Sequence, residues 1–183
     1  MTNFDECSGI RLYVYRMHED SPEKSTAMKL VRMGLASRYT YRKVPRDTVI
    51  LDPFSTIVIH KEDNPKGILV VDRSWNKLLE DKRLSTITGG IRRRLPALKA
   101  ANPINYSKLF MLSSAEALAA SLYLIGCESR ARQLLGVFKW GEEFFRLNNE
   151  LLNSYSEAST REELLAIEKR FLEKFYEGSG QDN

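Results

Sequence analysis

One stretch of the sequence predicts the fold: Ile68-Leu69-Val70-Val71-Asp72-Arg73-Ser74-Trp75. Its four consecutive aliphatic residues, preceded by Pro65 and Gly67, predict a strand that is buried on both faces, as is typical of a parallel sheet. In such sheets ligands bind just beyond the carboxyl ends of the strands, so Asp72 and Trp75 could offer a charge and a flat apolar surface. The alternative is that Asp72 caps a helix and Trp75 belongs to the core.

Composition limits the classes of protein that this chain can belong to. With 183 residues, 43% of them hydrophobic, it can form one compact domain or two small ones. No apolar run is long enough to cross a bilayer, and the N-terminal residues Asp5 and Glu6 are unlike a signal peptide. We therefore expect a cytoplasmic protein.

Cysteine and histidine are scarce, which argues against two further classes. Cys7 and Cys127 are too few for a disulfide scaffold. His18 and His60 lie far apart in the sequence and are not grouped with the cysteines. We expect neither a metal site nor Cys-His catalysis.

Basic residues are concentrated in the middle of the chain. The net charge is +4, and residues 73–108 hold nine basic residues against the acidic Glu80 and Asp81. Three of the basic residues, Arg92, Arg93 and Arg94, follow Gly89-Gly90, where the backbone can approach a ligand closely. This pattern favours binding to a polyanion, although a solvated basic face would give the same count.

Hydrophobic periodicity predicts strands followed by helices. The expected strands are residues 10–17, 48–51, 56–60, 68–71 and 108–112. The expected helices are residues 24–33, 92–101, 115–124, 129–138, 141–154 and 160–176. The sequence therefore predicts an α/β part with a parallel five-stranded sheet in residues 1–113 and an all-helical C-terminal part in residues 114–183.

Common catalytic motifs are absent. Gly89-Gly90 lacks the third glycine of a dinucleotide fingerprint, and no P-loop is present. No histidine is placed to serve Ser113 or Ser114 as a nucleophile. What remains is a ligand pocket without a catalytic team, which suits transfer from an already activated cofactor.

A resemblance to one family rests on several motifs. The long ones are Val70-Val71-Asp72-Arg73-Ser74-Trp75, Arg94-Leu95-Pro96-Ala97-Leu98-Lys99-Ala100-Ala101-Asn102-Pro103-Ile104-Asn105-Tyr106 and Leu112-Ser113-Ser114-Ala115-Glu116-Ala117. The shorter ones are Asp20-Ser21-Pro22-Glu23-Lys24-Ser25-Thr26, Leu51-Asp52-Pro53, Phe138-Lys139-Trp140-Gly141 and Leu147-Asn148. On these residues nearly the whole chain resembles the small-subunit ribosomal RNA aminocarboxypropyltransferases. It departs from the family's Asp-Pro-Lys-Lys-Cys-Thr by an inserted Ser21, by Glu23 for the first lysine and by Ser25 for the cysteine.

The resemblance implies a transferase that uses S-adenosylmethionine as co-substrate in ribosome biogenesis. It would move the 3-amino-3-carboxypropyl group onto a hypermodified uridine, N1-methylpseudouridine, of small-subunit rRNA and release methylthioadenosine. It also implies a SPOUT-like trefoil knot, a monomer, and small-subunit rRNA or a pre-ribosomal particle as partner. The alternatives are an S-adenosylmethionine-dependent RNA methyltransferase and a non-catalytic, RNA-binding assembly factor.

The resemblance further implies a set of cofactor-binding residues. They are Ser25, Thr26, Leu51, Pro53, Val71, Asp72, Trp75, Leu78, Leu95 and Phe110. Within this set Trp75 and Leu78 are expected to line the thioether end, and Ser25 and Thr26 to face the carboxylate. The backbone atoms expected to meet the ribose and adenine are those of Val71, Leu95 and Phe110. The side chains expected to pack on the ring are those of Leu51 and Pro53.

Asp72 is the expected catalytic residue, as a charge partner of the sulfonium or as acceptor of the uracil imide proton. An aspartate is a weak base, so the second role would need burial. For phosphate contacts with the RNA we expect five basic residues, with Lys66 and Lys139 behind them. The five are Lys24, Arg73, Lys77, Arg92 and Arg93.

Overall fold

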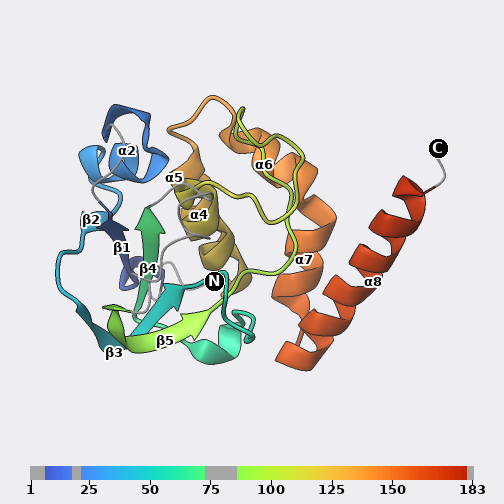
Figure 1. Cartoon of the computed structure of the whole chain (residues 1–183), viewed down its shortest axis with the longest axis horizontal. Coiled ribbons are helices and arrows are strands. Elements are labelled where there is room, and N and C mark those ends of the chain that lie inside the picture. Colours follow the sequence, from blue (N-terminus) through green and yellow to red (C-terminus); the bar gives the residue numbers. More distant parts are fainter. Residues whose placement is uncertain (1–6, 18–21, 73–85, 181–183) are drawn as a thin grey trace.

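The computed structural model describes residues 7–17, 22–72 and 86–180 (Figure 1). Five strands form one sheet in the order β2-β1-β4-β3-β5, and all neighbours are parallel. They are β1 (Arg11–Arg16), β2 (Ser37–Arg38), β3 (Lys43–Leu51), β4 (Gly67–Asp72) and β5 (Thr88–Arg93). The predicted five-stranded parallel sheet is confirmed, but β2 and β5 come from segments in which no strand was expected.

The central strand β4 contains the aliphatic run that predicts the fold. It is flanked by β1 on one side and by β3 on the other, so both of its edges are paired. Ile68 and Val70 belong to one buried cluster, whereas Leu69 and Val71 belong to another. Since neighbouring side chains of a strand point to opposite faces, the two clusters lie on opposite sides of the sheet. The prediction of a strand buried on both faces is confirmed.

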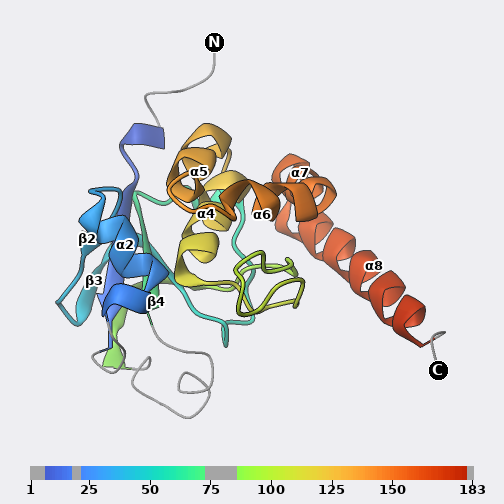
Figure 2. The same ribbon diagram turned by 90° about the horizontal axis from the view of Figure 1, so that it is seen from above.

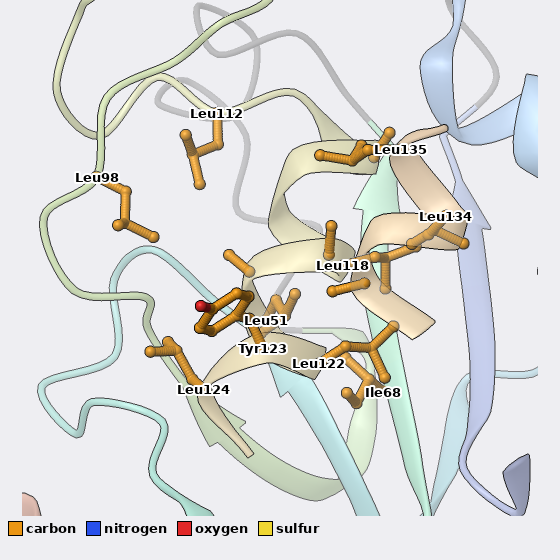
Figure 3. Close-up of a cluster of buried hydrophobic side chains, with 14 of the residues drawn as sticks. Leu51, Ile68, Leu98, Leu112, Leu118, Leu122, Tyr123, Leu124, Leu134 and Leu135 are labelled. Atoms are coloured by element: carbon orange, nitrogen blue, oxygen red, sulfur yellow. The ribbon is translucent and has the colours of Figure 1, made fainter. Parts of the chain in front are cut away.

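The larger cluster lies between the sheet and the helix α4 (Ser114–Leu124). Figure 3 shows Leu118 and Leu122 of α4 beside Leu51 and Ile68 of the sheet. Each of these four side chains is at most 7% exposed. Burial of this apolar surface is the main force that fixes α4 against the sheet.

The remaining helices lie before α4 and after it. They are η1 (Pro22–Lys24), α2 (Thr26–Arg32), η2 (Lys61–Asp63), α5 (Glu128–Leu135), α6 (Gly141–Leu147), α7 (Asn149–Glu157) and α8 (Arg161–Ser179). The expected helix 141–154 is interrupted at Asn148, whose side-chain amide donates to the carbonyls of Phe144 and Lys99. α8 extends away from the rest of the protein (Figure 2). None of the helices within the described ranges is long and apolar enough to cross a bilayer.

The helix expected at residues 92–101 is wrong. Arg92 and Arg93 belong to β5, and the chain continues without helical hydrogen bonds through Pro96, which has no N–H to donate. Instead, Ala97 N donates to Glu168 of α8, Lys99 N to Asn148 between α6 and α7, and Ala101 N to Glu116 of α4. Ala100 N donates to the Lys108 carbonyl. Tertiary hydrogen bonds therefore outweigh intrinsic propensity here.

Two expected strands are also wrong. In residues 56–60 only Val58 makes a bridge, to Arg94, and in residues 108–112 only Leu109 does, to Lys99. Ser107 and Phe110, which flank the second bridge, have left-handed φ angles of 65° and 60°. Such a backbone cannot continue a strand, so the bridge stays isolated.

The Gly89-Gly90 pair is explained by strand pairing rather than by a ligand. Both residues have positive φ, 77° and 62°. A Cβ atom at Gly89 would lie 2.3 Å from the carbonyl oxygen of Val44, and one at Gly90 would lie 2.9 Å from that of Thr48. The register between β3 and β5 shifts at this point. The close approach expected toward a ligand is therefore an approach of β5 to β3.

A single disulfide joins Cys7 to Cys127, with their Cα atoms 5.7 Å apart. The guanidinium of Arg130 donates to the carbonyls of Cys7 and Ile10 and reinforces the same junction. This bridge was not expected from the sequence, because two cysteines are too few for a disulfide scaffold and these two are 120 residues apart. It ties the segment before β1 to the start of α5.

Candidate functional site

The candidate site lies at the carboxyl edge of the sheet, where three neighbouring strands end. Leu51 is the last residue of β3, and it is in register with Val70 of β4 and Arg93 of β5. Val71 and Asp72 follow at the end of β4. Because parallel strands end at the same edge, the topology brings together the expected residues Leu51, Val71 and Asp72.

Two hydroxyl groups hold the carboxylate of Asp72. Ser25 Oγ donates to one oxygen at 2.6 Å, and Ser114 Oγ donates to the other at 3.3 Å. Ser25 is also the N-cap of α2, where it accepts a hydrogen bond from Met28 N at 3.0 Å. Ser114 is the first residue of α4. Asp72 therefore joins the sheet edge to the beginnings of two helices, and its carboxylate is fixed in direction.

Thr26 connects the same two helices by its own hydroxyl group. Its Oγ1 accepts a hydrogen bond from Ala115 N at 3.2 Å. The hydroxyl proton of Thr26 has no acceptor within residues 7–17, 22–72 and 86–180. Ser25, in contrast, already donates its proton to Asp72. Of the two residues expected to face a ligand carboxylate, only Thr26 keeps a free donor.

The turn after β3 is built by Asp52. Its carboxylate accepts from Phe54 N at 2.9 Å and pairs with Arg92 at 3.1 Å, and its N–H donates to the Arg93 carbonyl. This turn presents Pro53 at the surface directly beyond the sheet edge. The expected position of Pro53 beside the cofactor is compatible with this geometry.

The segment between β5 and α4 carries two more expected residues. Leu95 packs against the large buried cluster, and Phe110 is 42% exposed at the end of a tight loop. Backbone hydrogen bonds join Phe110 N to the Leu98 carbonyl and Ala100 N to the Lys108 carbonyl, so the loop closes on itself.

Glu116 anchors this loop to α4 from inside the protein. Its side chain is fully buried, and its carboxylate accepts from Ala101 N at 2.6 Å, from Asn102 N at 3.1 Å, from the Asn102 amide at 2.8 Å and from Ser113 N at 2.7 Å. Ser113 Oγ in turn accepts a hydrogen bond from Glu116 N, which completes a capping box. One carboxylate thereby fixes both the start of α4 and the loop 101–102.

Helices α7 and α8 hold the preceding part of the segment. Glu168 of α8 forms a bidentate pair with Arg94 at 2.7 and 3.0 Å and also accepts from Ala97 N at 2.6 Å. This hydrogen bonding raises the pKa of Arg94 above its ordinary value. Tyr155 of α7 donates to the Ala97 carbonyl at 3.0 Å, and burial raises the pKa of its phenol. The Arg94 side chain thus serves the fold.

Two of the residues expected to bind RNA are engaged in ion pairs. Arg92 pairs with Asp52 at 3.1 Å, and Arg93 pairs with Asp63 at 2.9 Å, where Arg161 also binds at 2.7 Å. The count of nine basic against two acidic residues overlooked these partners because they lie outside residues 73–108. The charge available to a phosphate at Arg92 and Arg93 is correspondingly smaller.

Of the remaining expected residues, some are exposed at the surface and others lie outside the described ranges. Lys24 is exposed in η1, and Lys66 and Lys139 are exposed as well. Four expected residues lie outside the described ranges: Arg73, Trp75, Lys77 and Leu78. Within those ranges no group of three or more His, Cys, Asp or Glu side chains is arranged to hold a metal ion.

Sequence reasoning missed two residues of the site. Ser114, which binds Asp72, was considered only as a nucleophile, and Glu116 was given no role. A signal for Glu116 was present, because Ser113-Ser114-Ala115-Glu116 is a capping-box pattern. Nothing in the local pattern indicates that the same carboxylate also binds loop 101–102.

Comparisons with known proteins agree on one family. A family profile described as "Ribosome biogenesis protein, C-terminal" matches residues 49–172. The 16S rRNA aminocarboxypropyltransferase of Thermoplasma volcanium is 42% identical over 164 residues, which cover 87% of this chain and 97% of that protein. The one of Methanosphaera stadtmanae is 37% identical over 168 residues, covering 89% and 98%. The solved structure of the SAM-dependent rRNA:acp-transferase Tsr3 from Vulcanisaeta distributa has a TM-score of 0.74 and 37% identity, covering 80% of this chain and 82% of that one.

Replacing Glu116 by glutamine should destabilise the protein by about 3 kcal/mol, because the amide nitrogen would face buried N–H donors that it cannot satisfy. Urea unfolding followed by circular dichroism measures this change. Glu128→Gln is a suitable control, since Glu128 forms an exposed i,i+4 pair with Arg132 and should cost less than about 0.5 kcal/mol. Equal unfolding midpoints for the two variants would contradict the role of Glu116.

Proposed function

This chain belongs to the 16S rRNA aminocarboxypropyltransferase family, and on this premise we propose that it modifies N1-methylpseudouridine, a hypermodified uridine of small-subunit rRNA. It is an rRNA aminocarboxypropyltransferase that uses S-adenosylmethionine. The observation that best supports a co-substrate site at the sheet edge is the carboxylate of Asp72, held by Ser25 and Ser114 at the carboxyl end of the central strand. Ligands of open parallel sheets bind at this edge.

The proposed reaction is a displacement at carbon. The ring nitrogen of the base attacks the γ-carbon of the 3-amino-3-carboxypropyl group, a C–N bond forms, and the C–S bond breaks. The electron pair of the broken bond stays on sulfur, so the sulfonium becomes the neutral thioether of methylthioadenosine. The imide proton leaves the base for Asp72 or for water. Because charge is neutralised in this step, a site that excludes water favours it without a dedicated acid.

Geometry must select which carbon beside the sulfur is attacked, because the methyl carbon is also reactive. In our proposal the backbone of Val71, Leu95 and Phe110 meets the ribose and adenine, and Leu51 and Pro53 pack on the ring. Trp75 and Leu78, which lie outside the described residues, line the thioether end. Support for this placement comes from the shared edge of β3, β4 and β5.

The structure refines the proposed carboxylate contact. Ser25 and Thr26 were expected to share it, but the proton of Ser25 is committed to Asp72. We therefore assign the contact with the co-substrate carboxylate to Thr26, which keeps a free hydroxyl proton at the start of α2. Ser25 then acts through Asp72 as a positioning residue.

Asp72 is proposed to act mainly as the charge partner of the sulfonium. It is partly buried, and both of its oxygens already accept hydrogen bonds. A carboxylate that is oriented in this way can attract a cation without moving. Accepting the imide proton stays a second possible role for the same group.

The proposed RNA contacts divide into two groups. Lys24 is exposed near Ser25, so its ammonium can meet a phosphate beside the site. Arg92 and Arg93 are paired with Asp52 and Asp63, and we give them a smaller share of phosphate binding. Arg73 and Lys77 keep the role that the family resemblance implies.

The remaining parts of the proposal concern topology and setting. We include the SPOUT-like trefoil knot, which is supported by the family resemblance and by an all-parallel sheet whose order departs from chain order. A cytoplasmic location and a monomeric state belong to the same proposal. The substrate would be small-subunit rRNA or a pre-ribosomal particle.

Labelled co-substrate should distinguish the proposed transfer from its alternatives. The protein is incubated with small-subunit rRNA that carries N1-methylpseudouridine but lacks the aminocarboxypropyl group, and with S-adenosylmethionine that carries label either in the carboxyl group or in the methyl group. We expect carboxyl label in the RNA and methyl label in methylthioadenosine. Methyl label in the RNA would instead show a methyltransferase, and RNA binding without either label would leave only an assembly factor.

Asp72→Asn should weaken S-adenosylmethionine binding and lower kcat/KM for it roughly tenfold or more, because the neutral amide cannot attract the sulfonium of the bound co-substrate at short range. The affinity for rRNA should be unchanged. Single-turnover transfer of carboxyl label, with the urea midpoint as a check of folding, measures the effect. Glu162→Gln, an exposed change in the first turn of α8, serves as the charge-matched control. A kcat/KM for S-adenosylmethionine equal to that of the control would refute the role of the carboxylate charge.

A further inference from the structure

A second basic surface lies on the segment that leads from β2 into β3. Residues 38–46 have the sequence Arg-Tyr-Thr-Tyr-Arg-Lys-Val-Pro-Arg, with four basic residues and no acidic one. The four, Arg38, Arg42, Lys43 and Arg46, are all exposed. This segment contains none of the family motifs, and it lies outside the basic region of residues 73–108.

These four cations differ from Arg92, Arg93 and Arg94 in having no carboxylate partner among the residues that the structure describes. Arg92, Arg93 and Arg94 each pair with an aspartate or a glutamate. For the four cations of segment 38–46, in contrast, the described part of the chain contains no ion pair. Their full charge is therefore available to an external anion.

The backbone of the segment is fixed, although its basic side chains are free. Arg38 pairs with Val14 in the sheet, and Tyr39 N donates to the Val14 carbonyl at 2.8 Å. The Tyr39 hydroxyl donates to the Lys43 carbonyl at 2.8 Å, and Thr88 N donates to the Arg42 carbonyl at the same distance. A fixed backbone lowers the entropy lost when the surface binds a ligand.

Tyrosines lie between the basic residues. Tyr13 and Tyr39 contact each other edge to face with ring centroids 5.1 Å apart, and Tyr39 contacts Tyr41 at 5.8 Å. The outermost ring, Tyr41, is 72% exposed. An exposed ring that is supported by two others offers a flat surface on which a base can stack.

We propose that segment 38–46, with Tyr13 beneath it, is a second RNA-binding surface that contacts phosphates through its four cations and an unpaired base through Tyr41. Unpaired cations around an exposed aromatic ring fit single-stranded or looped RNA better than an acidic protein segment, which has no planar bases to stack. The identity of the RNA rests on the proposed function; the existence of the surface does not.

The second surface begins at Arg38, which is level with the carboxyl edge of the sheet through its register with Val14 and Val70, and it extends from there to the opposite edge. Lys43 begins β3, whereas Leu51 ends that strand at the cofactor edge. A strand rises about 3.3 Å per residue, so the two ends of β3 lie on the order of 20 Å apart, even allowing for its irregularity. The end of the surface at Arg42, Lys43 and Arg46 would thus hold rRNA at a distance from the reacting base and fix its orientation.

Removing three of the charges tests the proposal. The variant Arg38→Gln, Arg42→Gln, Arg46→Gln should bind an rRNA fragment roughly tenfold more weakly, and the slope of log K against log salt should fall by about 2. The matched control removes three exposed charges from α8, with Lys169→Gln, Arg170→Gln and Lys174→Gln, and should change neither quantity. Fluorescence anisotropy over a range of salt concentrations measures both, and calorimetry should show unchanged affinity for S-adenosylmethionine.

Tyr41 provides a second and independent readout. Tyr41→Ala should weaken binding roughly five-fold or more with an unchanged salt slope, whereas Tyr41→Phe keeps the ring and should bind like the unmodified chain. Equal losses in the charge variant and its α8 control, or no loss in either, would overturn the proposal. Polyglutamate serves as a probe for an acidic protein segment. A charge variant that binds RNA normally but no longer binds polyglutamate would also overturn the proposal, because the surface would then recognise an acidic protein.

Failure of this proposal can be told apart from failure of the proposed function. A chain that transfers carboxyl label, while its charge variant binds RNA normally, keeps the function and loses the second surface. A chain that transfers no label, but binds RNA through segment 38–46, loses the function and keeps the surface.

Discussion

The structure depends on how the backbone of the segment between β5 and α4 satisfies its hydrogen bonds. Residues 96–102 of this segment are mostly buried but belong to no strand or helix, and a buried N–H without a partner is costly. Buried side chains from the helical part supply the partners: Glu168 for Ala97, Asn148 for Lys99 and Glu116 for Ala101. Ala97, Lys99 and Ala101 are two residues apart, so every second amide of this extended stretch donates to a side chain of the helical part.

This arrangement connects the two parts of the chain to one site. The segment carries Leu95 and Phe110, so the helices that bind its backbone also fix the part of the chain on which these two residues lie. Asp72 makes the complementary connection, because Ser25 and Ser114 join it to the starts of α2 and α4. The helical part therefore has a direct role in shaping the candidate site. It is not an appendage to a complete cofactor-binding domain.

The sequence predicted those features that depend on local pattern. The aliphatic run Ile68-Leu69-Val70-Val71 was enough to predict a central strand buried on both faces, and helical spacing placed α2 and α4 close to their observed bounds. The expected helix at residues 92–101 failed because its hydrogen-bond partners lie up to 74 residues away. Likewise, the pairing of Arg93 with Asp63 and the Cys7–Cys127 bridge join residues that no local pattern connects.

Within the site, the family resemblance was more informative than the pattern of residue types. Spacing alone could not indicate that Ser25 and Asp72, 47 residues apart, form a hydrogen bond. The resemblance placed both in one pocket, yet it assigned Ser25 to the co-substrate rather than to Asp72. The hydrogen-bond partner of each hydroxyl group depends on tertiary geometry. The different partners of Ser25 and Thr26 are therefore visible only in the structure.

The most direct test of this account is native-state hydrogen exchange of individual amides in the segment 94–112. The account predicts that the amides of Ala97 and Ala101 exchange as slowly as that of Val70 in β4, because buried carboxylates accept their hydrogen bonds. The exposed Tyr106, at the tip of the loop, should exchange much faster. If Ala97 and Ala101 exchanged as fast as Tyr106, the segment would not be held by the helices, and the account would be contradicted.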